Sequence, residues 1–260
     1  MNKTLLIILT MLFFQISFAQ EESSFDSGEW FRFKMSYSGF LKAGNATLTV
    51  RDYTYNDKDV YHILGKGWTT GAIKWFFKVR DRYESFIDKD TGAPYKFIRN
   101  IDEGGHTKNL EIEFDHNNNK ALVHNKKRNT KKAFTTKPNI HDMVSTYYYL
   151  RNNINVDSLK IGDEVSVNMF FDEENYGFKL KYLGKERINT QFGKVNTLKF
   201  RPYVMAGRVF KEEESLTLWV SNDKNKIPLR IKADLAIGSL RADLDAFKGL
   251  KHPFNIYIDN

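Results

Sequence analysis

The sequence predicts an all-β protein of mainly antiparallel strands, folded as a strongly curved sheet or as an open or closed β-barrel, with one short helix near residues 142–152. Aromatic residues, which favour strands, make up 15% of the chain, and only 5 residues are proline. Apolar and polar residues alternate with a period of two in many short segments. Turn-forming residues separate these segments, as they do in chains of hairpins.

The clearest alternation lies at residues 110–115, where Leu110, Ile112 and Phe114 alternate with acidic residues. Asparagines at 117–119 break the pattern before it resumes at 121–123, which predicts a hairpin with a polar tip. A similar alternation predicts an early half-buried strand at residues 31–37. Further strands are predicted at residues 46–50, 60–64, 79–87, 165–171, 178–182, 186–190, 195–201, 215–220, 229–232 and 240–244.

One segment departs from the period of two and predicts the helix. Asp142 is a suitable N-cap residue, and Pro138 precedes it. The three tyrosines at 147–149 would also suit a strand, so the residue types alone leave both options open. A second short helical turn is predicted near residues 73–77. The side chains that fall near helical spacing in the main segment are Met143, Val144, Tyr147, Leu150 and Arg151.

The N-terminal residues have the three parts of a secretory signal peptide. Lys3 precedes an apolar run at residues 5–14, and Ser17 and Ala19 supply the small residues of a cleavage site. The run is shorter than the roughly 20 apolar residues that span a bilayer. We therefore expect cleavage after Ala19, with an uncut anchor as the alternative. The remaining chain, residues 20–260, is predicted to form a single β-rich domain in the periplasm or cell envelope.

The composition limits the chemistry and the partners of the protein. The chain has no cysteine, which excludes disulfides, thiolate zinc sites, cysteine nucleophiles and a cysteine-linked lipid anchor. Its formal net charge of +8 favours anionic partners, such as acidic glycans, phosphorylated lipid headgroups or an anionic membrane face. Nucleic acid would suit this charge but not an exported protein, so we expect no nucleic-acid partner.

A series of short motifs resembles a known family. The most specific block is the segment 79–88, and it lies between a Lys-Ala-Gly-Asn-Ala segment at 42–46 and an Arg-Pro pair at 201–202. The segments 219–223, 227–229 and 238–244 complete the pattern. In this order the motifs resemble the DUF3108 family of exported Gram-negative bacterial proteins, and the junction at residues 18–20 resembles exported proteins of the Bacteroidota. The resemblance implies export and a mostly β fold, and it implies no catalytic residue.

Catalytic motifs are few. On a strand, Asp81 and Tyr83 share one face while Glu84 lies on the other. A carboxylate buried among apolar neighbours either needs a hydrogen-bonding or cationic partner, or acquires a raised pKa that suits a proton donor. If the protein is an enzyme, these three residues are the ones to test. The six histidines form no metal-binding motif and there is no nucleophile elbow, so we expect no metal and no cofactor.

Two groups of residues are candidates for ligand binding. The first is basic, because residues 117–141 contain six lysines and one arginine and no acidic residue. Such a run also occurs on exposed strand edges that must not aggregate. The second is aromatic and surrounds the glycines at 67 and 71, where rings can stack on sugars, line an acyl-chain cavity or fill a core. The predicted ligand-binding residues are Trp68, Trp75, Phe76, Arg80, Arg82, Lys126, Lys127 and Arg128.

These observations favour a non-catalytic envelope protein that binds an amphipathic or anionic ligand, such as a lipid, a glycolipid or an anionic glycan. The alternatives are an enzyme that acts on envelope polysaccharide and a structural or interaction module of an envelope assembly. A concave sheet around an apolar cavity would favour the first.

Overall fold

The computed structural model describes residues 22–203, 215–235 and 237–256. The predicted signal peptide at residues 1–19 lies outside the described residues. No helix of the described residues is long and apolar enough to cross a membrane. The strands are β1 (Trp30–Tyr37), β2 (Leu41–Tyr55), β3 (Lys58–Thr69), β4 (Val79–Asp88), β5 (Pro94–Glu103), β6 (His106–Asp115), β7 (Lys120–Asn125), β8 (Thr130–Thr135), β9 (Glu164–Phe171), β10 (Glu174–Thr190), β11 (Gly193–Pro202), β12 (Leu216–Ser221), β13 (Pro228–Asp234) and β14 (Ser239–Lys248).

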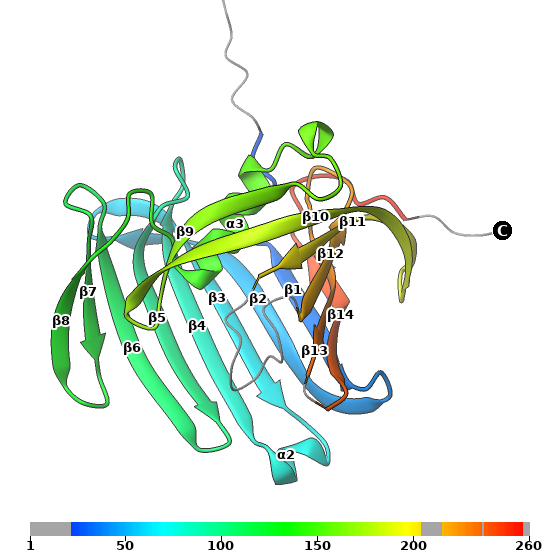
Figure 1. Ribbon diagram of the computed structural model, residues 1–260, viewed down its shortest axis with the longest axis horizontal. Helices are drawn as coiled ribbons and strands as arrows, with labels where there is room; N and C mark the ends of the chain where they lie inside the picture. Colours follow the sequence, from blue (N-terminus) through cyan, green and yellow to red (C-terminus); the bar gives the residue numbers. More distant parts are fainter. Residues whose placement is uncertain (1–21, 204–214, 236, 257–260) are drawn as a thin grey trace, which may run out of the picture.

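The described strands form one antiparallel 14-stranded sheet in the order β8-β7-β6-β5-β4-β3-β2-β1-β14-β13-β12-β11-β10-β9. The sheet curves strongly, so that β9 and β10 cross above β3–β6 (Figure 1). This architecture confirms the predicted fold class as the open, curved form. β1 pairs with β14 in the middle of the sheet and so joins the strands of the N-terminal half of the chain to those of the C-terminal half.

The two edge strands are linked by the segment that follows β8. The backbone of His141 donates to Asn168 and accepts from Phe170, each at 2.8 Å, and so pairs with the outer side of β9. The Asn175 side chain donates to the Thr135 carbonyl at 2.9 Å and accepts from the Lys137 amide at 3.0 Å. These contacts satisfy edge groups that would otherwise be open for strand addition.

Helix α3 (Met143–Asn153) lies against the concave side of the sheet and confirms the predicted helix. Asp142 caps it, because its carboxylate accepts from the Val144 and Ser145 amides at 2.7 and 2.8 Å, while the Ser145 hydroxyl accepts from the Asp142 amide. The Ser85 hydroxyl donates to the same carboxylate at 2.6 Å and ties the cap to β4. The predicted helical turn near 73–77 is α2 (Ile73–Phe76), and a 3-10 helix, η1, covers Val156–Ser158.

The predicted strands differ from the structure at three places. The segments predicted as separate strands at 178–182 and 186–190 form one strand, β10, because a bulge between Tyr182 and Gly184 absorbs the irregularity. Gly184 has a φ of +107°, which a side chain would disfavour. The other differences are β5, for which we predicted no strand, and β8, which we predicted only as part of a basic stretch. Lysines on this edge strand mask its period of two.

Candidate functional site

A cavity of about 540 Å³ lies between α3, the strands β9–β13 and the concave side of β1 and β2. Its surface is almost entirely apolar. Tyr203 and Leu216 belong to its wall and flank residues 204–214, which lie outside the described residues. The lining side chains are Phe33, Leu48, Met143, Thr146, Tyr147, Leu150, Arg151, Ile154, Met169, Phe171, Tyr176, Phe178, Leu180, Phe200, Pro202, Tyr203, Leu216, Leu218, Val220, Lys226, Pro228 and Ile231.

Two regular patterns create this wall. Along α3 and its C-cap residue Ile154, lining side chains recur at Met143, Tyr147, Leu150 and Ile154, which is the spacing of one helix face. On the strands they recur every second residue, for example at Leu216, Leu218 and Val220 of β12. The helix face and the strand faces therefore present hydrocarbon to the same space.

One side of the cavity wall contains a buried ion pair. The Arg151 guanidinium donates to both carboxylate oxygens of Glu29, each at 2.7 Å, and both residues are buried. Arg151 also donates to the carbonyls of Ser24 and Asn225. The Lys226 ammonium donates to the Arg151 carbonyl at 2.9 Å and places a second cation in the wall. Paired and hydrogen-bonded in this way, Arg151 is a structural group.

Tyr147 of α3 contributes a buried hydroxyl group to the cavity wall. Its hydroxyl is sealed from solvent and has no hydrogen-bond partner among the described residues. Its ring centroid lies 5.6 Å from the Arg151 guanidinium carbon. Burial raises the pKa of Tyr147 well above its usual range, so the hydroxyl stays protonated and is a potential donor in the cavity wall.

The turn between β9 and β10 connects the cavity to the opposite half of the sheet. Phe171 lines the cavity, and its ring centroid lies 4.7 Å from the guanidinium carbon of Arg99 on β5. Arg99 forms an ion pair with Asp172, and the Lys108 ammonium lies 2.7 Å from the same carboxylate group. The turn is held against β5 and β6 by charges on three different segments.

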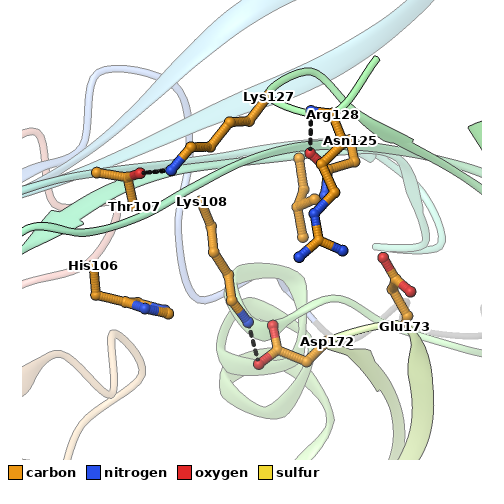
Figure 2. Close-up of a pocket in the computed structure, with 9 residues that line it drawn as sticks. His106, Thr107, Lys108, Asn125, Lys127, Arg128, Asp172 and Glu173 are labelled. Atoms are coloured by element: carbon orange, nitrogen blue, oxygen red, sulfur yellow. Dashed lines mark hydrogen bonds and ion pairs between the residues drawn. The ribbon is translucent and has the colours of Figure 1, made fainter. Parts of the chain in front are cut away.

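A second, charged pocket of about 460 Å³ lies on the other side of this turn. Figure 2 shows that Arg128, Lys108 and His106 point into the same space, with Asp172 and Glu173 opposite them. The Lys127 ammonium also lines the pocket and donates to the Thr107 hydroxyl at 2.6 Å. The pocket is therefore lined by both signs of charge, with the cations on the side of β6 and β7.

The predicted ligand-binding residues do not gather at one place. Lys127 and Arg128 line the charged pocket, whereas Lys126 faces Glu111, with 3.1 Å between the ammonium and carboxylate atoms. Trp75 and Phe76 stand almost fully exposed on α2. None of the eight lines the apolar cavity, and their role stays a prediction. The remaining three lie on β3 and β4, where Trp68 pairs with Arg80, and Arg82 forms an ion pair with Glu84.

The three residues proposed for catalysis lie on both faces of β4. Glu84 is buried between His62, at 2.8 Å, and Arg82, at 2.9 Å. Asp81 lies in register with Ile101 of β5 and accepts a hydrogen bond from the Asp102 amide at 3.3 Å. Burial, helped by the nearby Glu103 carboxylate, raises the pKa of Asp81 to about 6. Burial also raises the pKa of Tyr83, to about 12.

The sequence from residue 32 to residue 245 matches the family described as "Protein of unknown function (DUF3108)". The chain belongs to this family. The match covers β1 to β14, hence both halves of the sheet and every element of the cavity wall. The predicted resemblance is confirmed. The sequence matches none of the curated proteins with which it was compared.

One solved structure with a TM-score above 0.5 shows that this DUF3108 chain has a fold similar to that of a β-barrel-like protein. A β-barrel-like DUF1849 protein from Brucella abortus is 9% identical, with a TM-score of 0.56, over 86% of this chain and 98% of that chain. A DUF1089 protein from Pseudomonas aeruginosa is 8% identical, with a TM-score of 0.36, over 74% and 89% of the two chains. A candidate exported protein with a YmcC-like fold from Bacteroides fragilis is 9% identical, with a TM-score of 0.34, over 86% and 97%.

Sequence reasoning missed the residues that line the cavity, although part of their signal was visible. The spacing of Met143, Tyr147 and Leu150 predicts an apolar helix face, but not that this face borders an empty volume. No cluster of three or more His, Asp or Glu side chains able to hold a metal occurs within the described ranges.

Proposed function

We propose that this DUF3108 protein is an envelope protein that binds the hydrocarbon part of an amphipathic lipid or glycolipid in the apolar cavity, without catalysing a reaction. The observation that carries the proposal is the nearly all-apolar wall between α3 and β9–β13. Its volume of about 540 Å³ lies within the usual range of ligand pockets, about 300–1,000 Å³. An apolar cavity of this size favours an apolar occupant over water.

The energetics of such binding follow from apolar transfer. Each methylene group removed from water contributes about 0.8 kcal/mol, so a segment of ten methylenes contributes about 8 kcal/mol before the cost of association. A binding free energy of about 8 kcal/mol corresponds to a micromolar Kd, so we expect micromolar affinity at best for a single acyl chain. Because the Glu29 carboxylate neutralises the Arg151 guanidinium, Arg151 needs no anionic group of a ligand inside the cavity.

Native mass spectrometry and lipid extraction of the protein purified from its own envelope fraction would test the proposal. We expect a co-purifying lipid and displacement of a fluorescent fatty-acid probe. Leu218→Trp places a larger side chain in the cavity wall and should weaken probe binding at least tenfold. Leu122→Trp is the matched control, because Leu122 is exposed on β7 outside the cavity. Equal binding by both variants would contradict the proposal.

A second candidate is an enzyme that acts on envelope polysaccharide, and the raised pKa of Asp81 favours it. A carboxyl group with a pKa of about 6 can donate a proton near neutral pH. Asp81→Asn would abolish hydrolysis of a peptidoglycan or exopolysaccharide substrate if Asp81 were the acid. An unchanged release of reducing sugar by this variant would remove this candidate.

A further inference from the structure

We propose that the protein docks on an anionic phospholipid bilayer through an apolar tip, which we define as Phe40, Leu41, Trp75, Phe76, Phe77 and Ile237. This docking surface is separate from the cavity, so the inference does not depend on the ligand proposed above. It rests on the exposure of the tip, on the way its turns are tied together, and on the charge around it.

The exposure of these side chains is exceptional for apolar residues. Trp75 is 88% exposed, Phe76 is 87%, Phe40 is 86% and Ile237 is 81%. Single exposed apolar residues are ordinary, but a group of large ones marks an interaction surface. Tryptophan and phenylalanine are also the residues with which peripheral proteins enter the headgroup region of a bilayer.

Three turns bring the tip residues to one end of the sheet. The β1–β2 turn carries Phe40 and is tied to the β13–β14 turn, because the Tyr37 hydroxyl donates to the Ile237 carbonyl at 2.8 Å. The β3–β4 connection carries α2 and is tied to β2, because the Thr70 amide donates to the Ala43 carbonyl at 3.0 Å. Figure 1 shows α2 at the end of the sheet remote from α3.

The charge around the tip selects an anionic surface over a neutral one. Three exposed lysines lie beside the aromatic side chains, namely Lys42, Lys74 and Lys78, and none of them forms an ion pair within the part of the chain that the structure describes. Residues 69–78 contain no acidic residue. Lysines that reach the headgroup level while aromatic rings enter the interface are typical of peripheral membrane binding.

A bilayer fits this tip better than a folded protein partner does. The tip residues lie on turns, at the start of β2 and on and beside the short helix α2. A protein interface would require a complementary hollow in the partner, whereas lipid headgroups rearrange around exposed apolar side chains. The experiment must therefore also be able to detect a protein partner that binds the tip in place of a bilayer.

Flotation with vesicles tests the proposal. We expect the mature protein to bind vesicles of phosphatidylethanolamine and phosphatidylglycerol, and to bind phosphatidylcholine vesicles far less. The double variant Trp75→Ser, Phe76→Ser should lower binding roughly a hundredfold, because two rings lose their apolar environment. Replacing Lys42, Lys74 and Lys78 by Gln should lower it roughly fivefold per lysine, and the loss should shrink as salt is raised.

Two controls separate docking from misfolding and from non-specific adhesion. Ile161→Ser removes an apolar residue that is 75% exposed and lies outside the tip, and it should leave flotation unchanged. Tryptophan emission of the wild type should be quenched by vesicles with brominated acyl chains, and Trp75→Phe should remove that quenching. No flotation of the wild type, an equal loss for Ile161→Ser, or a stoichiometric protein partner that depends on Trp75 without vesicle binding would each overturn the proposal.

Discussion

The Arg151 guanidinium on α3 and the Glu29 carboxylate just before β1 form a buried two-bond ion pair, with both distances at 2.7 Å. The Tyr148 hydroxyl donates to the same carboxylate at 3.3 Å. This pair joins the helix to the start of the sheet and thereby fixes one wall of the apolar cavity. The position of α3, and so the shape of the cavity, depends on a contact between residues 122 positions apart in the chain.

Glu29→Gln should strongly destabilise the protein. The substitution leaves the Arg151 charge buried with no counter-ion, and such a loss costs about 3–5 kcal/mol. Urea denaturation followed by tryptophan fluorescence measures the change. Lys224→Ala is the control, because it breaks an exposed pair with Glu22 and should cost less than about 1 kcal/mol. Similar losses for the two variants would show that the buried pair does not hold α3.

Asp142 and His141 are neighbours whose effects on stability oppose each other between about pH 4 and pH 6.5. Burial raises the pKa of Asp142 from 3.8 to about 6, so the folded state binds the extra proton and stability falls as pH rises through this window. Burial lowers the pKa of His141 from 6.5 to about 4, so the unfolded state binds the extra proton and stability rises with pH. Each effect amounts to about 3 kcal/mol.

We therefore predict that single variants uncover a pH dependence that the wild type conceals. Relative to wild type, Asp142→Asn should gain stability as pH rises from about 4 to 6.5, and His141→Phe should lose it. The free energy of unfolding in urea at several pH values measures both slopes. The double variant should return to the wild-type slope. Parallel profiles for all four proteins would show that neither group titrates abnormally.

The regular elements could be predicted from sequence because they follow from local periodicity. The alternation of Leu110, Ile112 and Phe114 gives β6 directly, and Asp142 with helical spacing gives α3. The assignment of Asp81 and Glu84 to opposite faces of one strand was also accessible, since a strand has a period of two. These features need only residues that lie close together in the chain.

The candidate site could not be predicted, because it depends on distant segments. An inward apolar residue such as Leu218 looks the same in sequence whether it packs against a neighbour or borders an empty volume. The charged pocket joins Lys108 to Arg128 only through the register of β6 and β7. High aromatic content also suggests core filling, whereas Trp75 lies on the surface.

Asp172→Asn should loosen the turn between β9 and β10. Asp172 and Glu173 have φ values of 47° and 71°, and asparagine tolerates this left-handed region, so the turn itself is retained. The substitution removes the counter-charge of Arg99 and Lys108, which is worth about 1 kcal/mol. Because Phe171 belongs to the cavity wall, we expect faster exchange of turn amides and faster release of a fatty-acid probe.

Asp52→Asn is the control for this turn variant. Asp52 forms an exposed ion pair with Lys89 at 2.6 Å, at a site that does not line the cavity. This variant should leave both the amide exchange of residues 171–176 and the probe release rate unchanged. Identical kinetics for the two aspartate variants would mean that the Asp172 contacts do not restrain access to the cavity.

Tyr147 and Tyr148 are adjacent on α3 and provide the final prediction, because only the Tyr148 hydroxyl of the two has a hydrogen-bond partner among the described residues. The Tyr147 hydroxyl is buried with no hydrogen-bond partner among the described residues, so Tyr147→Phe should raise the free energy of unfolding by about 1 kcal/mol. The Tyr148 hydroxyl donates to Glu29, so Tyr148→Phe should lower it by about 1 kcal/mol. Urea denaturation distinguishes the two signs. A loss of stability for Tyr147→Phe would show that its hydroxyl is satisfied in solution. Retained affinity for a fatty-acid probe in Tyr147→Phe is expected, because a hydrocarbon chain makes no use of that donor.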